Sequence, residues 1–262
     1  MKEELNICLL QCDLHWEDAE GNRNQIADYL AAVEGVDIII LPEMFSTGFS
    51  VESTHLAETM EGETVAWMKS MSHKKNSVLC GSMMINENGN VYNRLLWVEP
   101  NGLIQHYDKR HLFSLIDEQK YFTAGTERLI IEYKGWKICP LICYDLRFPV
   151  FSRNDVNYDL CFYVANWPDK RIAAWDTLLK ARAIENQTYV IGLNRVGIDG
   201  YKAEYSGHSQ VIDPKGDIIA SAPENEIGLV ELTLSKSHLE TLRERLPFLD
   251  DRDQFELMIK KD

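Results

Sequence analysis

The sequence predicts an α/β protein in which two sheets pack face to face and helices lie outside both of them. Three observations favour this fold: predicted strands and helices alternate along the chain, the second half repeats the order of the first, and no linker separates the halves. The chain has 262 residues, of which 45% are hydrophobic, so it can bury a core without disulfides or a structural metal. We therefore expect a single domain spanning residues 1–262.

The first half opens with a strand followed by a helix. Residues 5–11 form a mostly apolar strand. A helix is expected after Asn22, because apolar residues recur on one face from 26 to 33, and Gly35 ends it. Residues 36–41 form a continuous apolar run around one aspartate, which indicates a central strand covered on both faces.

A second helix and three strands complete the first half. The helix is predicted over residues 64–73 and the strand after it over 78–85. Sequences rich in Asn and Gly then bracket a strand at 91–98 and lead to another at 103–107. Such short turns predict antiparallel hairpins at the flank of the sheet.

The second half begins with a hairpin at residues 129–142 that turns at Lys134-Gly135. A strand at 159–165 and a helix at 171–187 follow it. The helix is expected to direct four apolar side chains inward: Ile172, Trp175, Leu179 and Ile184.

The remaining elements are mainly strands. One strand is predicted at 189–193, and 208–212 and 217–220 form a hairpin around an Asp-Pro-Lys-Gly turn. Residues 228–232 form a last strand, and a short helix starts at Ser235.

Composition excludes several classes of function. The formal net charge of −14 repels phosphate backbones and anionic lipids, so neither nucleic acid nor membrane is an expected partner. No apolar run approaches the ~18–20 residues that cross a bilayer. No secretory signal is recognisable, and five of the six cysteines lie in apolar stretches, which predicts reduced thiols in the cytoplasm. Neither C-x-x-C nor H-E-x-x-H occurs, so no metal site is expected.

Three reactive side chains stand where predicted strands end. Glu43 follows the central strand, Lys109 follows the strand of the flanking hairpin, and Cys143 follows the strand that ends at Ile142. Taken singly, they could be a surface carboxylate, a solvated lysine and a core thiol. In an α/β sheet, however, strand ends are where functional side chains gather, so the three together predict a site.

Acyl transfer is the chemistry that these groups favour. A free thiol is only a few per cent ionised at neutral pH, so a nucleophilic Cys143 needs a base or a cation nearby. Glu43 can act as the base, and Lys109 can keep Glu43 ionised. Lys109 and the backbone N–H of Tyr144 can stabilise the oxyanion, and Glu43 can later activate water to cleave the thioester.

Three segments carry a resemblance to the nitrilase superfamily: 41–45 (LPEMF), 107–113 (YDKRHLF) and 141–149 (LICYDLRFP). The likeness continues through 181–186 (ARAIEN) and 207–216 (GHSQVIDPKG). It implies a four-layer αββα sandwich of two mixed sheets, a Glu-Lys-Cys triad, no metal or organic cofactor, and a homodimer or higher homo-oligomer. It also implies a second carboxylate, for which Glu118 is the best match and Asp117 the fallback; a solvated loop acid is the alternative for Glu118.

Within the superfamily the chain looks most like the ω-amidase branch. That resemblance implies hydrolysis of 2-oxoglutaramate or 2-oxosuccinamate, small-molecule amides, to the 2-oxo acid and ammonia. An anionic substrate entering an acidic protein needs a local cation, and Arg147 is the first candidate, although it could instead form a structural ion pair with Asp145 or another acid. Arg171 and Lys170 are weaker options.

Aromatic residues near the strand ends are expected to wall the pocket, although such residues also occur in cores. They are Phe45, Phe113 and Trp167. Two other hypotheses stay open. One is an enzyme of the same fold with another outcome, namely an aliphatic amidase, a nitrilase or an N-carbamoyl amide hydrolase. The other is a non-catalytic binding protein, which the presence of all three triad residues disfavours.

Overall fold

The computed structural model describes residues 3–258, so the ends of the predicted domain, residues 1–2 and 259–262, lie outside the described residues. Its first sheet has six strands in this order: β14 (Gly228–Ser235), β1 (Glu4–Gln11), β2 (Ile38–Ile40), β3 (Val78–Glu87), β4 (Asn90–Val98) and β5 (Ile104–Asp108). Strands β1, β2 and β3 run parallel, and the other neighbours are antiparallel.

The second sheet also has six strands, in this order: β13 (Ile218–Ser221), β12 (Gln210–Ile212), β9 (Tyr189–Asn194), β8 (Leu160–Ala165), β7 (Trp136–Ile142) and β6 (Ile131–Tyr133). Here β7, β8 and β9 are parallel, and the flanking pairs are antiparallel. Both sheets are therefore mixed, as predicted, and each places hairpins beside a parallel centre.

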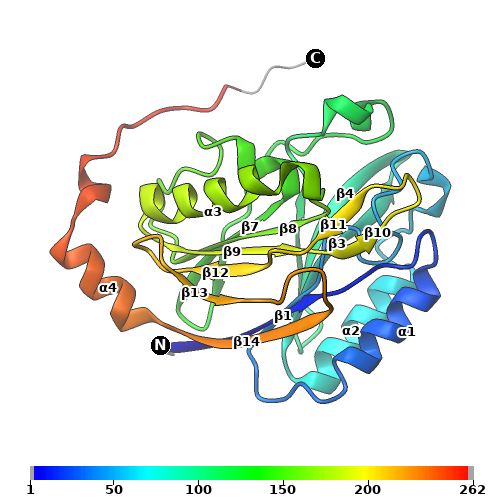
Figure 1. Ribbon diagram of the computed structural model, residues 1–262, viewed down its shortest axis with the longest axis horizontal. Helices are drawn as coiled ribbons and strands as arrows, with labels where there is room; N and C mark the ends of the chain where they lie inside the picture. The colour runs from blue at the N-terminus through cyan, green and yellow to red at the C-terminus, as the bar shows by residue number, and fades with distance from the viewer. Residues whose placement is uncertain (1–2, 259–262) are drawn as a thin grey trace.

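Helices cover the outer faces of the two sheets. Helices α1 (Ala19–Tyr29) and α2 (Glu63–Lys75) lie outside the first sheet, and α3 (Ile172–Asn186) lies outside the second (Figure 1). Helix α4 (Lys236–Arg245) follows β14 near the end of the chain. The predicted αββα arrangement is confirmed.

The main core lies between the two sheets. Leu5, Ile7 and Leu9 on β1 belong to the same buried cluster as Ile138 and Leu141 on β7. Alternate β1 residues face the other way, because successive side chains of a strand point to opposite faces. They join a second cluster under α1 and α2. Burial on both faces of β1 explains why its sequence reads as an apolar run.

Two details of the helices differ from the prediction. Helix α1 begins at Ala19 rather than after Asn22, because the Asp18 carboxylate accepts a hydrogen bond of 2.8 Å from the N–H of Gly21 and caps the helix. On α3, Trp175 and Leu179 are buried as expected, but Ile184 is 54% exposed. The inward face of α3 is completed by Ala183, so the next residue points to the flank of the helix.

The sequence pattern missed several short elements. Strands β10 (Val196–Ile198) and β11 (Glu204–Ser206) form a separate two-stranded hairpin. The part of the chain that the structure describes also contains six short 3₁₀ helices: η1 (Thr54–Leu56), η2 (Ser114–Ile116), η3 (Glu118–Lys120), η4 (Cys143–Arg147), η5 (Asp169–Arg171) and η6 (Phe248–Asp251). Unlike the equally short β2 and β12, which lie within longer predicted strands, these segments of three to five residues are too short by themselves to show an apolar period.

The strand ends converge as expected. Glu43 lies just beyond β2, Lys109 directly follows β5, Cys143 directly follows β7, and Asn166 directly follows β8. Two of these strands belong to each sheet, so the site forms where the edges of both sheets meet. None of the helices described between residues 3 and 258 has the length and apolarity needed to span a membrane.

Candidate active site

Cys143 directly follows β7 and is the first residue of η4, at a sharp turn of the chain. Its φ of +43° lies in the left-handed region, which costs a residue with a side chain some backbone strain. The neighbouring backbone is fixed by the buried carboxylate of Asp145, which accepts from the N–H of Ile142 at 3.0 Å. The same carboxylate accepts from the Tyr107 hydroxyl at 2.7 Å and the His111 N–H at 3.0 Å. Asp145 thus joins the cysteine turn to the segment that carries Lys109.

Glu43 is fully buried, and both oxygens of its carboxylate are hydrogen bonded. Oε1 lies 2.9 Å from Nζ of Lys109 and accepts from Nδ2 of Asn93 at 2.8 Å. Oε2 accepts from the backbone N–H of Asn166 at 2.8 Å. This carboxylate therefore connects residues from both sheets.

Lys109 is the cation between two buried carboxylates. Its Nζ lies 2.9 Å from Glu43, and 3.0 and 3.1 Å from the two oxygens of Glu118. Glu118 is itself buried and accepts from the backbone N–H of Phe113 at 2.5 Å. Asp117, the fallback for the second carboxylate, is instead exposed and pairs with Lys120 at 2.8 Å.

Burial and charge set the protonation of this cluster. Burial acts to lower the pKa of Lys109, but the charges of Glu118 and Glu43 outweigh it, and the pKa is raised. The pKa of Glu118 is raised by burial despite the nearby ammonium. Burial, followed by the charge of Glu43, raises the pKa of the Cys143 thiol well above its usual range. The resting nucleophile is therefore a thiol, which needs a base before it can attack.

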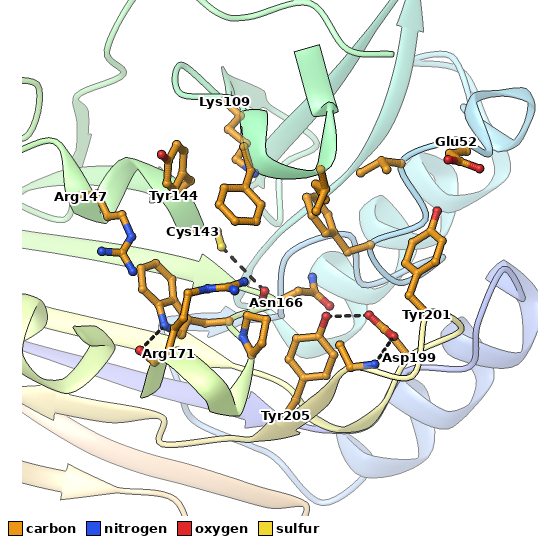
Figure 2. Close-up of a pocket in the computed structure, with 17 residues that line it drawn as sticks. Glu52, Lys109, Cys143, Tyr144, Arg147, Asn166, Arg171, Asp199, Tyr201 and Tyr205 are labelled. Carbon is orange, nitrogen blue, oxygen red and sulfur yellow. Dashed lines mark hydrogen bonds between the residues drawn. The ribbon is translucent and has the colours of Figure 1, made fainter. Parts of the chain in front are cut away.

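A cavity of about 250 Å³ opens above Cys143. Figure 2 shows the residues around it: Phe49, Val51, Glu52, Lys109, Phe113, Ile116, Cys143, Tyr144, Arg147, Asn166, Trp167, Pro168, Arg171, Asp199, Tyr201, Ala203 and Tyr205. Cys143 is 8% exposed, whereas the other five cysteines are completely buried. Only this thiol is within reach of a molecule in the cavity.

Two of the three predicted wall aromatics, Phe113 and Trp167, line the cavity. The expectation for Phe45 is wrong. Phe45 is buried in the second cluster, on the side of the first sheet that α1 and α2 cover, and it packs against Trp67 with 6.0 Å between ring centroids. Phe49, later in the same loop, takes a place in the wall instead.

Two guanidinium groups lie on one side of Cys143 (Figure 2). Arg147 stacks on the ring of Trp167 at 4.8 Å, and Arg171 stacks on the ring of Phe113 at 5.2 Å. Within residues 3–258 neither arginine forms an ion pair, so the alternative that Arg147 pairs with Asp145 does not hold. Lys170 is exposed and does not line the cavity.

Sequence reasoning missed four polar residues of the site: Asn93, Asn166, Asp199 and Tyr205. Asn166 directly follows β8, so the strand-end argument could have found it. Asp199 and Tyr205 come from the β10–β11 hairpin and bond to each other at 2.7 Å. Asn93 lies inside β4, where no pattern in the sequence distinguishes it from a core residue.

No group of three or more His, Cys, Asp or Glu side chains in the described part of the chain is arranged to hold a metal ion. All six cysteines are free thiols. The arrangement that the structure does provide is a thiol, a carboxylate and an ammonium at the base of a cavity, which is suited to nucleophilic acyl transfer.

Known proteins are similar to this chain in sequence. The carbon-nitrogen hydrolase family model matches residues 6–244. The omega-amidase YafV of Escherichia coli is 45% identical over 253 residues, which cover 97% of this chain and 98% of that protein. The 2-oxoglutaramate amidase of Bacillus subtilis is 33% identical over 252 residues, 94% of this chain and 96% of that one.

A solved structure agrees with the sequence comparisons. The crystal structure of XC1258 from Xanthomonas campestris, described as a CN-hydrolase superfamily protein with an arsenic adduct in its active site, is 44% identical to this chain. The two superpose with a TM-score of 0.96 over 98% of this chain and 100% of that one. On the strength of the family match across most of its length, this chain belongs to the carbon-nitrogen hydrolase family.

Proposed function

We propose that this carbon-nitrogen hydrolase cleaves the terminal amide of 2-oxo dicarboxylic acid monoamides, 2-oxoglutaramate and 2-oxosuccinamate, to the 2-oxo acid and ammonia. The observation that carries the proposal is the buried contact of Glu43, Lys109 and Glu118 beside the only accessible thiol, Cys143. The similarity to an omega-amidase and to a 2-oxoglutaramate amidase supports the choice of substrate.

The first half of the reaction forms a thioester. Glu43 takes the proton of the Cys143 thiol as Sγ attacks the amide carbon, and the carbonyl oxygen becomes an oxyanion. The ammonium of Lys109 and the backbone N–H of Tyr144 stabilise that negative charge. Glu43 then returns the proton to the nitrogen, the C–N bond breaks, and ammonia leaves.

The second half hydrolyses the thioester. Glu43 takes a proton from a water molecule, whose oxygen attacks the acyl carbon, and the same two donors again hold the oxyanion. The C–S bond breaks, the proton returns to sulfur, and the 2-oxo acid is released. Glu118 has no step of its own in this scheme; it holds Lys109 in place through two short contacts.

Arg147 is proposed to bind the carboxylate of the substrate. Its guanidinium faces the cavity and stacks on Trp167. The backbone N–H of Trp167 donates a hydrogen bond of 2.8 Å to Oδ1 of Asn194, which fixes this residue. Arg171 is a second cation on the same wall. Because the protein carries a charge of −14, such local cations are needed to attract an anionic substrate.

Replacing Arg147 with glutamine is expected to reduce kcat/KM for 2-oxoglutaramate by about 10- to 100-fold, the effect of losing a charged hydrogen bond. For a neutral aliphatic amide such as butyramide the loss is expected to stay below about 3-fold. Steady-state ammonia release on both substrates measures the difference. The exposed Lys170→Gln is the matched control, and equal losses on both substrates would show that Arg147 has only a structural role.

A substrate panel tests the function as a whole. The purified protein is assayed for ammonia release from 2-oxoglutaramate, succinamate, glutamine, asparagine, an aliphatic nitrile and N-carbamoyl-β-alanine. The expected result is strong turnover of 2-oxoglutaramate that depends on Cys143. Preferred turnover of the nitrile or the carbamoyl compound would retain the nucleophile and overturn the choice of substrate.

We infer that the protein works in the cytoplasm and as a homodimer. Six free thiols, five of them fully buried, support a reducing compartment. The exposed side chains of Ile184, Ile218 and Ile219 provide apolar surface that a second copy could cover. Light scattering of the purified protein measures the oligomeric state directly.

A further inference from the structure

The carboxylate of Glu43 is held by two asparagines that come from different sheets. Asn93 lies on β4 of the first sheet and donates from Nδ2 to Oε1 at 2.8 Å. Asn166 follows β8 of the second sheet; its backbone N–H donates to Oε2 at 2.8 Å, and its Nδ2 donates to the backbone oxygen of Glu43 at 2.6 Å. Asn166 lines the cavity, whereas Asn93 lies behind it and is completely buried.

Asn93 also contacts the lysine segment. Its backbone oxygen accepts from the backbone N–H of Lys109 at 2.9 Å, at the point where β5 ends. One residue therefore contacts the side chain of the general base and the backbone of the cation. Because both contacts come from the same short stretch of β4, a shift of Asn93 would move the two groups together.

The Asn93 side chain makes a single hydrogen bond within residues 3–258, and that bond goes to the general base. Among the described residues its only hydrogen bond is the one to Glu43, and its Oδ1 has no partner. In Asn154, by contrast, both ends of the amide have partners: its Oδ1 accepts from the N–H of Tyr158, and its Nδ2 donates to the backbone oxygens of Tyr158 and Asn186. The Asn93 side chain therefore gains its one polar contact from the Glu43 carboxylate, whereas Asn154 bonds only to backbone atoms.

We propose that Asn93 is a positioning residue that orients the Glu43 carboxylate and favours its charged form during catalysis. This inference rests on the proposed role of Glu43 as the general base. A neutral amide donor bonds more strongly to a carboxylate than to a carboxylic acid. Once Glu43 has taken the thiol proton, the bond from Asn93 weakens. Asn93 therefore promotes return of that proton to the departing nitrogen.

The test compares two substitutions at Asn93 with the same two at Asn154. Asn93→Leu removes the donor and keeps the side chain close in volume, and Asn93→Asp keeps the shape but replaces the amide donor with a carboxyl group beside Glu43. Both are expected to lower kcat for 2-oxoglutaramate by about 10- to 100-fold, with KM changed by less than about 2-fold. In a plot of kcat/KM against pH, the acid limb, where activity falls at low pH, is expected to move to higher pH, because the charged form of the Glu43 carboxylate has lost a donor.

Asn154→Leu and Asn154→Asp provide the matched control, because Asn154 is equally buried but lies before β8, at the end of that strand remote from Asn166. These variants are expected to lower the melting temperature while the kcat of the folded enzyme and the acid limb stay at wild-type values. If Asn93 had only a structural role, its variants would also lower the melting temperature and leave kcat and the acid limb at wild-type values. Wild-type kcat and acid limb in folded Asn93→Leu would overturn the inference, and Asn93→Asp provides the same test if Asn93→Leu does not fold.

Glu43→Gln separates failure of this inference from failure of the proposed function. If Glu43→Gln is inactive and the Asn93 variants behave as wild type, only the role of Asn93 is wrong. If Glu43→Gln keeps wild-type activity, the base itself is misassigned and the inference falls with it. If Glu43→Gln and the Asn93 variants all lose activity, and the acid limb shifts in the Asn93 variants, the result supports both Glu43 as the base and Asn93 as its positioning residue.

Discussion

Replacing Cys143 with alanine is expected to lower kcat/KM for 2-oxoglutaramate by at least about 10⁴-fold, the loss typical of removing a catalytic nucleophile. The remaining groups could still bind the substrate, but no other thiol reaches the cavity, because the other five cysteines are fully buried. Without Sγ there is no acyl-enzyme, and the amide must be attacked by water in one step. Ammonia release with excess enzyme gives the residual rate.

Acid quenching during turnover tests the same step in the wild type. Intact-mass measurement is expected to show a fraction of the protein heavier by one acyl group, and that fraction is expected to be absent in Cys143→Ala. Cys161→Ala is the matched control, because Cys161 is a buried thiol on β8 that does not line the cavity. It is expected to turn over normally. Undiminished ammonia release by Cys143→Ala would overturn the thioester mechanism.

Replacing Lys109 with methionine is expected to cost both activity and stability. The variant loses an oxyanion donor, which lowers kcat by about 10²- to 10³-fold or more. It also leaves the carboxylates of Glu43 and Glu118 buried without the ammonium that lies between them. Breaking a buried ion pair in this way typically destabilises a protein by about 3–5 kcal/mol.

The stability loss in Lys109→Met is expected to depend on pH. The pKa of Glu118 is already raised by burial, and it rises further when Lys109 is absent. A carboxyl whose folded pKa lies above its unfolded value of about 4.3 favours folding at low pH, and this contribution disappears as the pH rises through the folded pKa. The melting temperature of the variant should therefore be nearest to wild type at about pH 5 and fall further behind it towards about pH 8.

Lys120→Met is the control for this effect. Lys120 lies in the same loop, but its side chain is 63% exposed and its partner Asp117 is also at the surface. Exposed ion pairs contribute little, so the melting temperature and kcat are expected to stay near wild-type values at every pH. A melting-temperature difference between Lys109→Met and wild type that is the same from pH 5 to pH 8 would contradict the buried-charge argument.

Much of this protein could be predicted from local sequence patterns. The long strands and helices were located because runs of apolar residues with a clear period extend over several turns or pleats. Glu43, Lys109 and Cys143 could be proposed together because each directly follows such a run. The errors were also local: the cap by Asp18 moved the start of α1, and Phe45 and Ile184 took orientations set by their neighbours.

The sequence by itself determined the order of the elements, the two mixed sheets and the reactive groups at the strand ends. Only the tertiary structure decided how those groups are held, since Asn93 and Asn166 reach Glu43 across 50 and 123 residues of chain. It also decided that Arg147 and Arg171 lie on aromatic rings rather than beside acids. A sequence pattern records whether a residue is apolar and how often such residues recur. Hydrogen-bond partners and protonation depend instead on the packing of the two sheets against each other, which brings distant side chains within about 3 Å and excludes water from between them.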